Sequence, residues 1–194
     1  MSSVTLTAFM QGQQIAQGNL SELLRQIKAT PIGNEPVFIF DDQTGKRLDI
    51  YVHGDEASAI AAYPELATPQ TEAPAAIKSR GRPKLGVSAK EVTLLPRHWE
   101  WLATQPGGAS ATLRRLIEQA KKASEPADNK RRRHESAYQF MHELAGDLPE
   151  YETCLRALFA DDETAFSAAM EGWPQDIRRY AAQLAFGKQE PKND

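Results

Sequence analysis

A proline-rich stretch divides the chain and limits how it can fold. Residues 63–77 contain Pro64, Pro69 and Pro74 among Ala, Thr and Glu. Proline lacks a backbone N–H and fixes φ, so repeated prolines stop both helices and central strands. Such a composition is typical of a semi-extended linker. We therefore predict a domain boundary here, with an N-terminal module over residues 1–62.

The N-terminal module has the hydrophobic pattern of strands around one helix. Apolar residues alternate over 4–10 and over 48–52, and residues 37–40 form a continuous apolar run. These patterns predict strands, with 4–10 buried on one face, and a further strand near 14–17. Asn19 three residues before Glu22 is a helix N-cap signal, followed by leucines and an isoleucine at helical spacing. The order predicts a ββαββ module, with a short helix over 56–62.

The segment after the linker predicts a strand and two helices. Residues 91–95 suit a short strand, and helices are expected over 96–104 and 110–122, separated by Gln-Pro-Gly-Gly. Pro126 is expected to end the second helix region. Trp99 suits the core. Trp101, two residues on, must face another way and suits packing on the acidic helices or on a partner chain.

The remainder of the chain predicts an acidic helical bundle over residues 126–187. Apolar residues recur at helical spacing in four stretches, and Trp173-Pro174 opens the last of them. Tyr151, Leu155, Leu158 and Phe159 are expected to share one buried face. Residues 188–194 are predicted to be a disordered tail. The fold class is thus α+β: a small N-terminal ββαββ module, a Pro-rich linker, a basic strand-helix-helix segment over 78–125, and a C-terminal helical bundle.

Charge is distributed unevenly along the chain. Residues 78–133 hold 14 Lys and Arg against 5 Asp and Glu, a net charge of +9, while the other residues carry −12. A basic stretch between acidic parts favours a polyanion ligand such as nucleic acid. A solvated linker that keeps the chain soluble is the alternative.

One short motif in the basic segment resembles an AT-hook. It runs Lys78-Ser-Arg80-Gly81-Arg82-Pro83-Lys84. In this resemblance the side-chain-free glycine lets the backbone lie deep in a narrow A·T minor groove, where the two arginines extend along the floor. Pro83 keeps the arm extended, and the flanking lysines reach phosphates.

The residues after this arm resemble a ribbon-helix-helix domain. Glu91–Leu95, the Pro-led helix, the Gly-containing turn, the Ser110 cap and the second helix follow that order. The resemblance implies a homodimer whose paired strands face the major groove, with the second helix meeting phosphate at its N-terminus. A glutamate on the ribbon would be repelled by DNA, so the strand could pair two chains without reading bases. A helical hairpin packed on the C-terminal helices is the alternative fold. The residues expected to position the backbone are Lys90, Arg97, Arg114 and Arg115.

Other candidate sites are weaker. Lys130, Arg131, Arg132 and Arg133 form a second basic cluster that suits phosphate binding or a solvated helix start. No catalytic, metal-binding or cofactor motif is complete, since His134-Glu135 lacks the second histidine of HExxH. The single cysteine, Cys154, reads as a buried thiol. The sequence therefore predicts no enzyme, no metal and no cofactor.

The order of segments as a whole resembles an uncharacterised bacterial family, classed as a domain of unknown function. The resemblance rests on residues 36–45, 79–118, 145–162 and 172–185, and implies no established activity. We predict a cytoplasmic DNA-binding protein with a role in transcriptional regulation, acting as a homodimer without membrane contact. A protein-interaction or adaptor module and an enzyme with an unrecognised site are the alternatives.

Overall fold

The computed structural model describes residues 4–33, 35–52, 56–67 and 90–187, and has the predicted α+β class. The chain forms two compact units. The first combines residues 1–72 with 129–194, and the second holds residues 73–128. The predicted segments 1–62 and 126–187 thus share one unit instead of forming separate parts. The predicted arm and tail lie outside the described residues.

A four-stranded antiparallel sheet lies at the centre of the first unit. It consists of β1 (Leu6–Met10), β2 (Gln13–Gly18), β3 (Phe38–Asp41) and β4 (Arg47–Leu48), in the order β2-β1-β3-β4. Gln11 and Gly12 both have positive φ, as a two-residue hairpin turn requires. The predicted ββαββ order is confirmed, although the return strand is shorter than residues 48–52.

One face of the sheet is covered by α1 (Leu20–Ala29). This helix begins at Asn19, where the predicted cap with Glu22 is present in both directions. The leucines at helical spacing and Ile27 are buried against Leu6, Ala8 and Ile39 of the sheet. The short helices α2 (Glu56–Ala62) and α3 (Pro64–Ala67) follow, and α2 has the predicted bounds.

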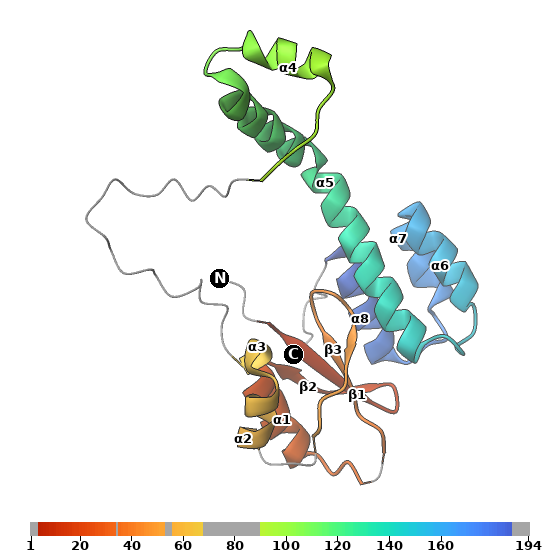
Figure 1. Cartoon of the computed structure of the whole chain (residues 1–194). Helices are drawn as coiled ribbons and strands as arrows, with labels where there is room; N and C mark the ends of the chain where they lie inside the picture. The colour runs from red at the N-terminus through yellow and green to blue at the C-terminus, as the bar shows by residue number, and fades with distance from the viewer. Residues whose placement is uncertain (1–3, 34, 53–55, 68–89, 188–194) are drawn as a thin grey trace. The chain divides into compact units, whose positions relative to one another are not determined.

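The opposite face of the sheet is covered by C-terminal helices, so the expectation that residues 4–10 bury only one face is wrong. Leu6, Thr7, Ala8 and Phe9 are all buried. Phe9 and Phe40 point away from α1 into a second core, which α5 (Gly108–Leu144), α6 (Tyr151–Ala160), α7 (Glu163–Ala169) and α8 (Gln175–Phe186) complete. The unit is therefore layered, with the sheet between α1 and the C-terminal helices (Figure 1).

Both hairpin turns of the sheet are fixed to C-terminal helices by polar contacts. In the β3–β4 turn, the Ser136 hydroxyl of α5 donates to the Gln43 carbonyl at 2.7 Å. In the β1–β2 hairpin, the Gln14 backbone N–H donates to the Asp176 carboxylate of α8 at 2.9 Å. Asp42, in the β3–β4 turn, accepts two hydrogen bonds on the same carboxylate oxygen. One comes from the Thr7 hydroxyl of β1 and the other from the Tyr180 hydroxyl of α8, each at 2.7 Å.

The second unit, within its described residues, is a helical hairpin. Helix α4 (Pro96–Ala103) leads through a turn to α5 (Gly108–Leu144), whose residues from 129 onward belong to the first unit. The predicted start of the first helix and the intervening turn are confirmed, whereas the predicted Ser110 cap is wrong, because α5 already begins at Gly108 and Ser110 lies inside its first turn. Leu102 and Thr112 are the buried side chains among residues 90–128.

Four further local predictions for the segments after the linker are wrong. Residues 91–95 form no strand, since no neighbouring strand lies among the described residues of this chain. Pro126 lies inside α5: the absence of one backbone hydrogen bond is outweighed by the flanking Ala, Lys and Glu and by the packing of the last turns. Trp99 and Phe159 are 42% and 59% exposed, so neither is a core residue, although the Phe159 ring lies 6.1 Å from that of Tyr138.

The packing of the β3–β4 turn on α5 gives a stability prediction. Gly45 has a φ of +65°, and a Cβ on it would lie 1.8 Å from the Ser136 carbonyl oxygen. We expect Gly45→Ala to lower the free energy of unfolding by about 2–4 kcal/mol, from overpacking together with the left-handed backbone. Urea unfolding followed by circular dichroism measures this.

The matched control is Gly33→Ala. Gly33 also has a positive φ, +53°, but a Cβ there meets nothing within 4 Å. Gly33→Ala should lower the free energy of unfolding by only about 1 kcal/mol, which is the cost of placing alanine in the left-handed backbone conformation. Equal losses in the two variants would show that the contact with α5 contributes nothing to stability.

Candidate nucleic-acid interface

The structure describes part of the predicted site. The AT-hook-like arm over 78–84, with Lys78, Arg80, Gly81, Arg82, Pro83 and Lys84, lies outside the described residues. Lys90 and Arg97 of the second unit are exposed, as are Arg114 and Arg115 in the first turns of α5.

Two pairs of basic residues recur along the start of α5. Arg114 and Arg115 are followed by Lys121 and Lys122, seven residues later. Seven residues are nearly two helical turns, so both pairs lie on the same side of the helix. All four side chains are exposed, and we call these four residues the basic face of α5. The sequence prediction of site residues missed the two lysines, although their seven-residue spacing from the arginines is visible in the sequence.

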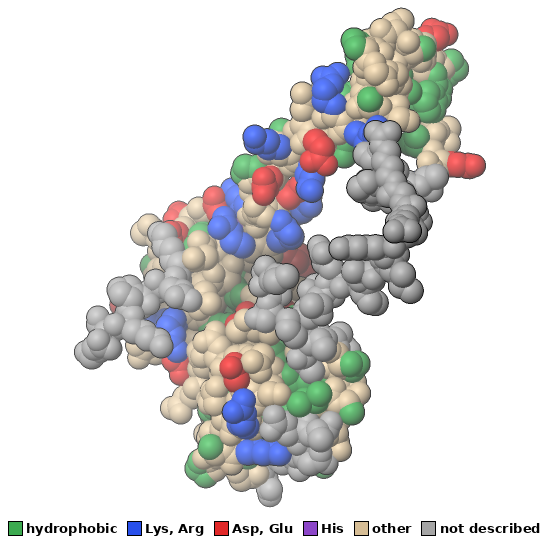
Figure 2. Space-filling view, turned by 90° about the vertical axis from the view of Figure 1, so that its left-hand side faces the viewer, with side chains coloured by type: hydrophobic (Ala, Val, Ile, Leu, Met, Phe, Trp, Pro, Cys, Tyr) green, Lys and Arg blue, Asp and Glu red, His purple; other side chains and the backbone are tan. Residues whose placement is uncertain are grey.

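The basic face of α5 carries more positive than negative charges. Glu118 and Glu125 lie on the same side of α5, which leaves four positive charges against two negative ones. Within the part of the chain that the structure describes, no ion pair involves Arg114, Arg115, Lys121 or Lys122. These cations are consequently available to a polyanion. Figure 2 shows Lys and Arg side chains on the exposed surface of α5.

The other side of the same helical turns is apolar. Thr112 is buried, Leu113 is half-buried, and Leu116 and Ile117 continue the same stripe with Ala120. At about 100° per residue, the centre of this stripe lies opposite the basic face, and Ile117 lies at its edge next to Lys121. The start of α5 is thus two-sided, with cations on one side and apolar side chains on the other.

The second basic cluster, Lys130–Arg133, is partly used by the fold itself. The Lys130 ammonium lies 2.8 Å from the Asp161 carboxylate, and the His134 ring nitrogen lies 3.1 Å from its other oxygen. The hydrogen bond from Lys130, with a further one from His134, lowers the pKa of Asp161. Arg132 is hydrogen-bonded to Asn129. This cluster therefore anchors α5 to the end of α6 and offers fewer free charges than the sequence predicts.

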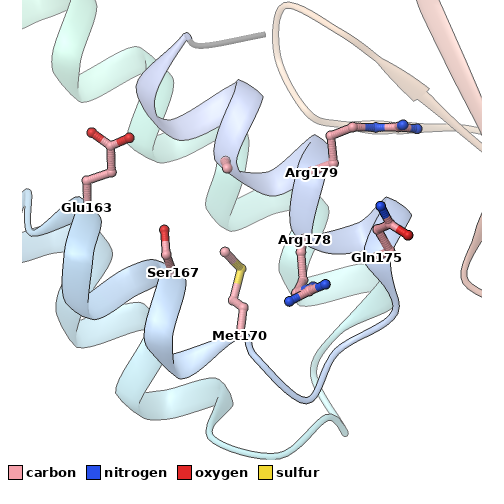
Figure 3. Close-up of a pocket in the computed structure, with 7 residues that line it drawn as sticks. Glu163, Ser167, Met170, Gln175, Arg178 and Arg179 are labelled. Atoms are coloured by element: carbon pink, nitrogen blue, oxygen red, sulfur yellow. The ribbon is translucent and has the colours of Figure 1, made fainter. Parts of the chain in front are cut away.

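A shallow pocket opens between α7 and α8 (Figure 3). Its volume is about 310 Å³, and Glu163, Ser167 and Met170 line it from the α7 side. Arg179, on the α8 side, is already paired with Asp176 at 2.9 Å and with Gln14 at 3.1 Å. Glu163 is the single carboxylate among the lining residues, and no histidine lines the pocket. The pocket therefore holds no pair of groups arranged for acid–base chemistry.

Other chemical features of the described residues are few. The described ranges contain no cluster of three or more His, Cys, Asp or Glu side chains suited to a metal. Burial raises the pKa of Cys154 to about 12, so its thiol is unreactive at neutral pH. Among the described helices, none is both long enough and apolar enough to cross a membrane.

The fold is α+β, and its candidate site is the exposed basic face of α5. By sequence, it is a member of the family described as an uncharacterized protein conserved in bacteria (DUF2239), which matches residues 5–185. The predicted family membership is confirmed. Comparison with curated proteins and with solved structures found no match.

The Lys130–Asp161 pair gives a prediction about pH. Because the pKa of Asp161 is lowered in the folded protein, the pair stabilises the fold above the ordinary Asp pKa, and this stabilisation disappears as pH falls through the lowered value. Lys130→Met should raise the pKa of Asp161 toward its ordinary value, as a carboxyl ¹³C NMR titration would measure. Lys28→Met on α1 is the matched control and should leave that pKa unchanged. An unmoved Asp161 titration in Lys130→Met would show that the pair is not formed in solution.

Proposed function

We propose that this protein binds DNA through the Arg-Gly-Arg-Pro arm over 78–84 and the basic face of α5. The observation that carries the proposal is the basic face itself: four exposed cations, none in an ion pair within the described residues, at a two-turn repeat. In this proposal Arg80 and Arg82 enter an A·T minor groove, and the face neutralises phosphates.

The spacing of the basic face suits a polyphosphate backbone. The two pairs are separated by about 10 Å along the helix axis, from the rise of 1.5 Å per residue. Point charges at such a separation neutralise phosphates without reading bases, so this contact positions the protein. Any sequence preference then comes from the arm. Lys90 and Arg97 add phosphate contacts near the start of the hairpin.

The proposal extends to a homodimer and to a role in regulation. Two copies would bring two arms to one duplex. Once the first arm is bound, the second is held at a high effective concentration near the DNA, which raises the overall affinity of the dimer. A reducing, cytoplasmic setting is consistent with the single, buried cysteine.

A protein-interaction module is the second candidate function. The observation that favours it is apolar exposure in the second unit, where Val92, Trp101 and Ile117 are 57%, 49% and 60% exposed. Large exposed apolar side chains are typical of protein interfaces. The experiment on nucleic acid separates the two functions, since an adaptor of this kind does not need the basic face.

The test of DNA binding is fluorescence anisotropy over a salt series. The probes are an A·T-rich duplex, a G·C-rich duplex and a single-stranded RNA. We expect the wild type to prefer the A·T duplex and to lose affinity steeply with salt. Arg80→Ala/Arg82→Ala should abolish the A·T preference, whereas replacing all four residues of the basic face by Ala should weaken binding to both duplexes. The logarithmic salt slope should fall by about 0.9 for each phosphate that the variant no longer neutralises.

The matched control is Arg25→Ala/Lys28→Ala, which removes two exposed cations of α1 outside the basic segment. This variant should bind as the wild type does. Absence of binding at low salt would overturn the proposal, and so would equal losses in the control and in the basic-face variant. Either result would favour the interaction module.

A further inference from the structure

The contact between α4 and α5 is closed near the turn and open away from it. Leu102, three residues before the turn, is 2% exposed, and Thr112, in the first turns of α5, is also 2% exposed. Further from the loop, Trp99 of α4 is 42% exposed and Leu95, the residue before α4, is 50% exposed. Leu102, Trp99 and Leu95 lie at i, i−3 and i−7, so they form one stripe.

The α5 side of the same contact opens in the same way. Leu113 is half-buried near the turn, whereas Leu116 and Ile117 are 36% and 60% exposed. We call Leu95, Trp99, Leu116 and Ile117 the open seam. Figure 2 shows hydrophobic side chains gathered over α4 and the start of α5. Among residues 90–128 one leucine and one threonine are buried, so the α4–α5 hairpin gains little from its own packing and a further partner would stabilise it.

We propose that the open seam is covered by the open seam of a second copy of this chain, so that two α4–α5 hairpins form a four-helix dimer. This inference names the interface of the proposed homodimer and rests on that part of the proposed function, but not on DNA binding. A twofold interface requires one surface to be complementary to itself. A stripe of apolar side chains on two antiparallel helices satisfies this, as in four-helix bundles.

The exposed area is sufficient for a specific dimer. With Val92 beside it, the open seam exposes roughly 450 Å² of apolar side chain per chain, taking ordinary side-chain areas. Two copies would bury about 900 Å² of apolar surface, which at the roughly 65% apolar share of homodimer interfaces means about 1,400 Å² in total. Specific protein interfaces bury roughly 1,200–2,000 Å². A second copy therefore accounts for the exposure without any other partner.

The proposed interface leaves the basic face free. Leu116 lies on the side of α5 opposite Arg114 and Lys121, whereas Ile117 lies at the border between the two sides, about one helical turn from each of these cations. A dimer built on the open seam would thus present two basic faces outward. The interface and the proposed DNA contact use different residues of the same helical turns, and each can be removed without the other.

The experiment is sedimentation velocity over a concentration series without DNA, on the full chain. The wild type should sediment as a dimer of twice 21.5 kDa at micromolar concentration. Trp99→Glu/Ile117→Glu should weaken dimerisation at least about a hundredfold, as expected when two interface anchors become charged. Both side chains are exposed in the single chain, so the fold of the first unit should be retained, as thermal unfolding would check.

Phe159→Glu is the matched control, because Phe159 is an exposed apolar residue of α6, outside the open seam. It should remain dimeric, as should the basic-face variant that no longer binds DNA. Intrinsic fluorescence gives a second measurement: emission from Trp99 should shift to shorter wavelength as concentration rises, over the signals of Trp101, which lies outside the open seam, and of Trp173, which is 4% exposed. A monomeric wild type, or a dimer that persists in Trp99→Glu/Ile117→Glu, would overturn the proposal whatever the outcome with DNA.

Discussion

The first unit depends on the packing of two sheet phenylalanines against the C-terminal helices. The rings of Phe9 and Phe40 lie 5.2 and 5.0 Å from that of Phe140, and the ring of Tyr180 lies 4.7 Å from Phe140. These residues come from positions far apart in the chain, so the sheet and α5 to α8 form a single core. Tyr180 also donates to Asp42, which joins the apolar contact to a polar one.

This core explains why a four-stranded sheet with one short edge strand can be stable. A sheet covered on one face by a single helix leaves its other face in water, and strands apolar on both faces need two covering layers. The turn contacts of Ser136 and Asp176 then fix the sheet's register against α5 and α8. The pKa of Tyr180 is raised, mainly because the hydroxyl is buried and also because Asp42 lies next to it. The hydroxyl therefore stays a hydrogen-bond donor at any physiological pH.

Helix α5 has a different role at each end. Its last turns bury Phe140 and Met141 in the core of the first unit, whereas its first turns carry cations on one side and the open seam on the other. Surface cations contribute little to stability, and exposed apolar side chains contribute nothing until they are covered. The exposed cations and apolar side chains at the start of α5 therefore do not stabilise the fold of a single chain, and binding partners account for them better. DNA for the basic face and a second copy for the open seam are the ligands we propose.

The sequence by itself determined the local elements and the chemistry of the surface. Hydrophobic periodicity and the Asn19 cap predicted the ββαββ order, and composition located the basic segment. These signals are local, since they depend on residues within a few turns of one another. The tertiary structure alone decided that the two ends of the chain share a core, that α5 continues through Pro126, and that Lys130 binds Asp161. Each of these depends on contacts between residues distant in sequence, or on packing energy that overrides a local preference, and no local pattern encodes either.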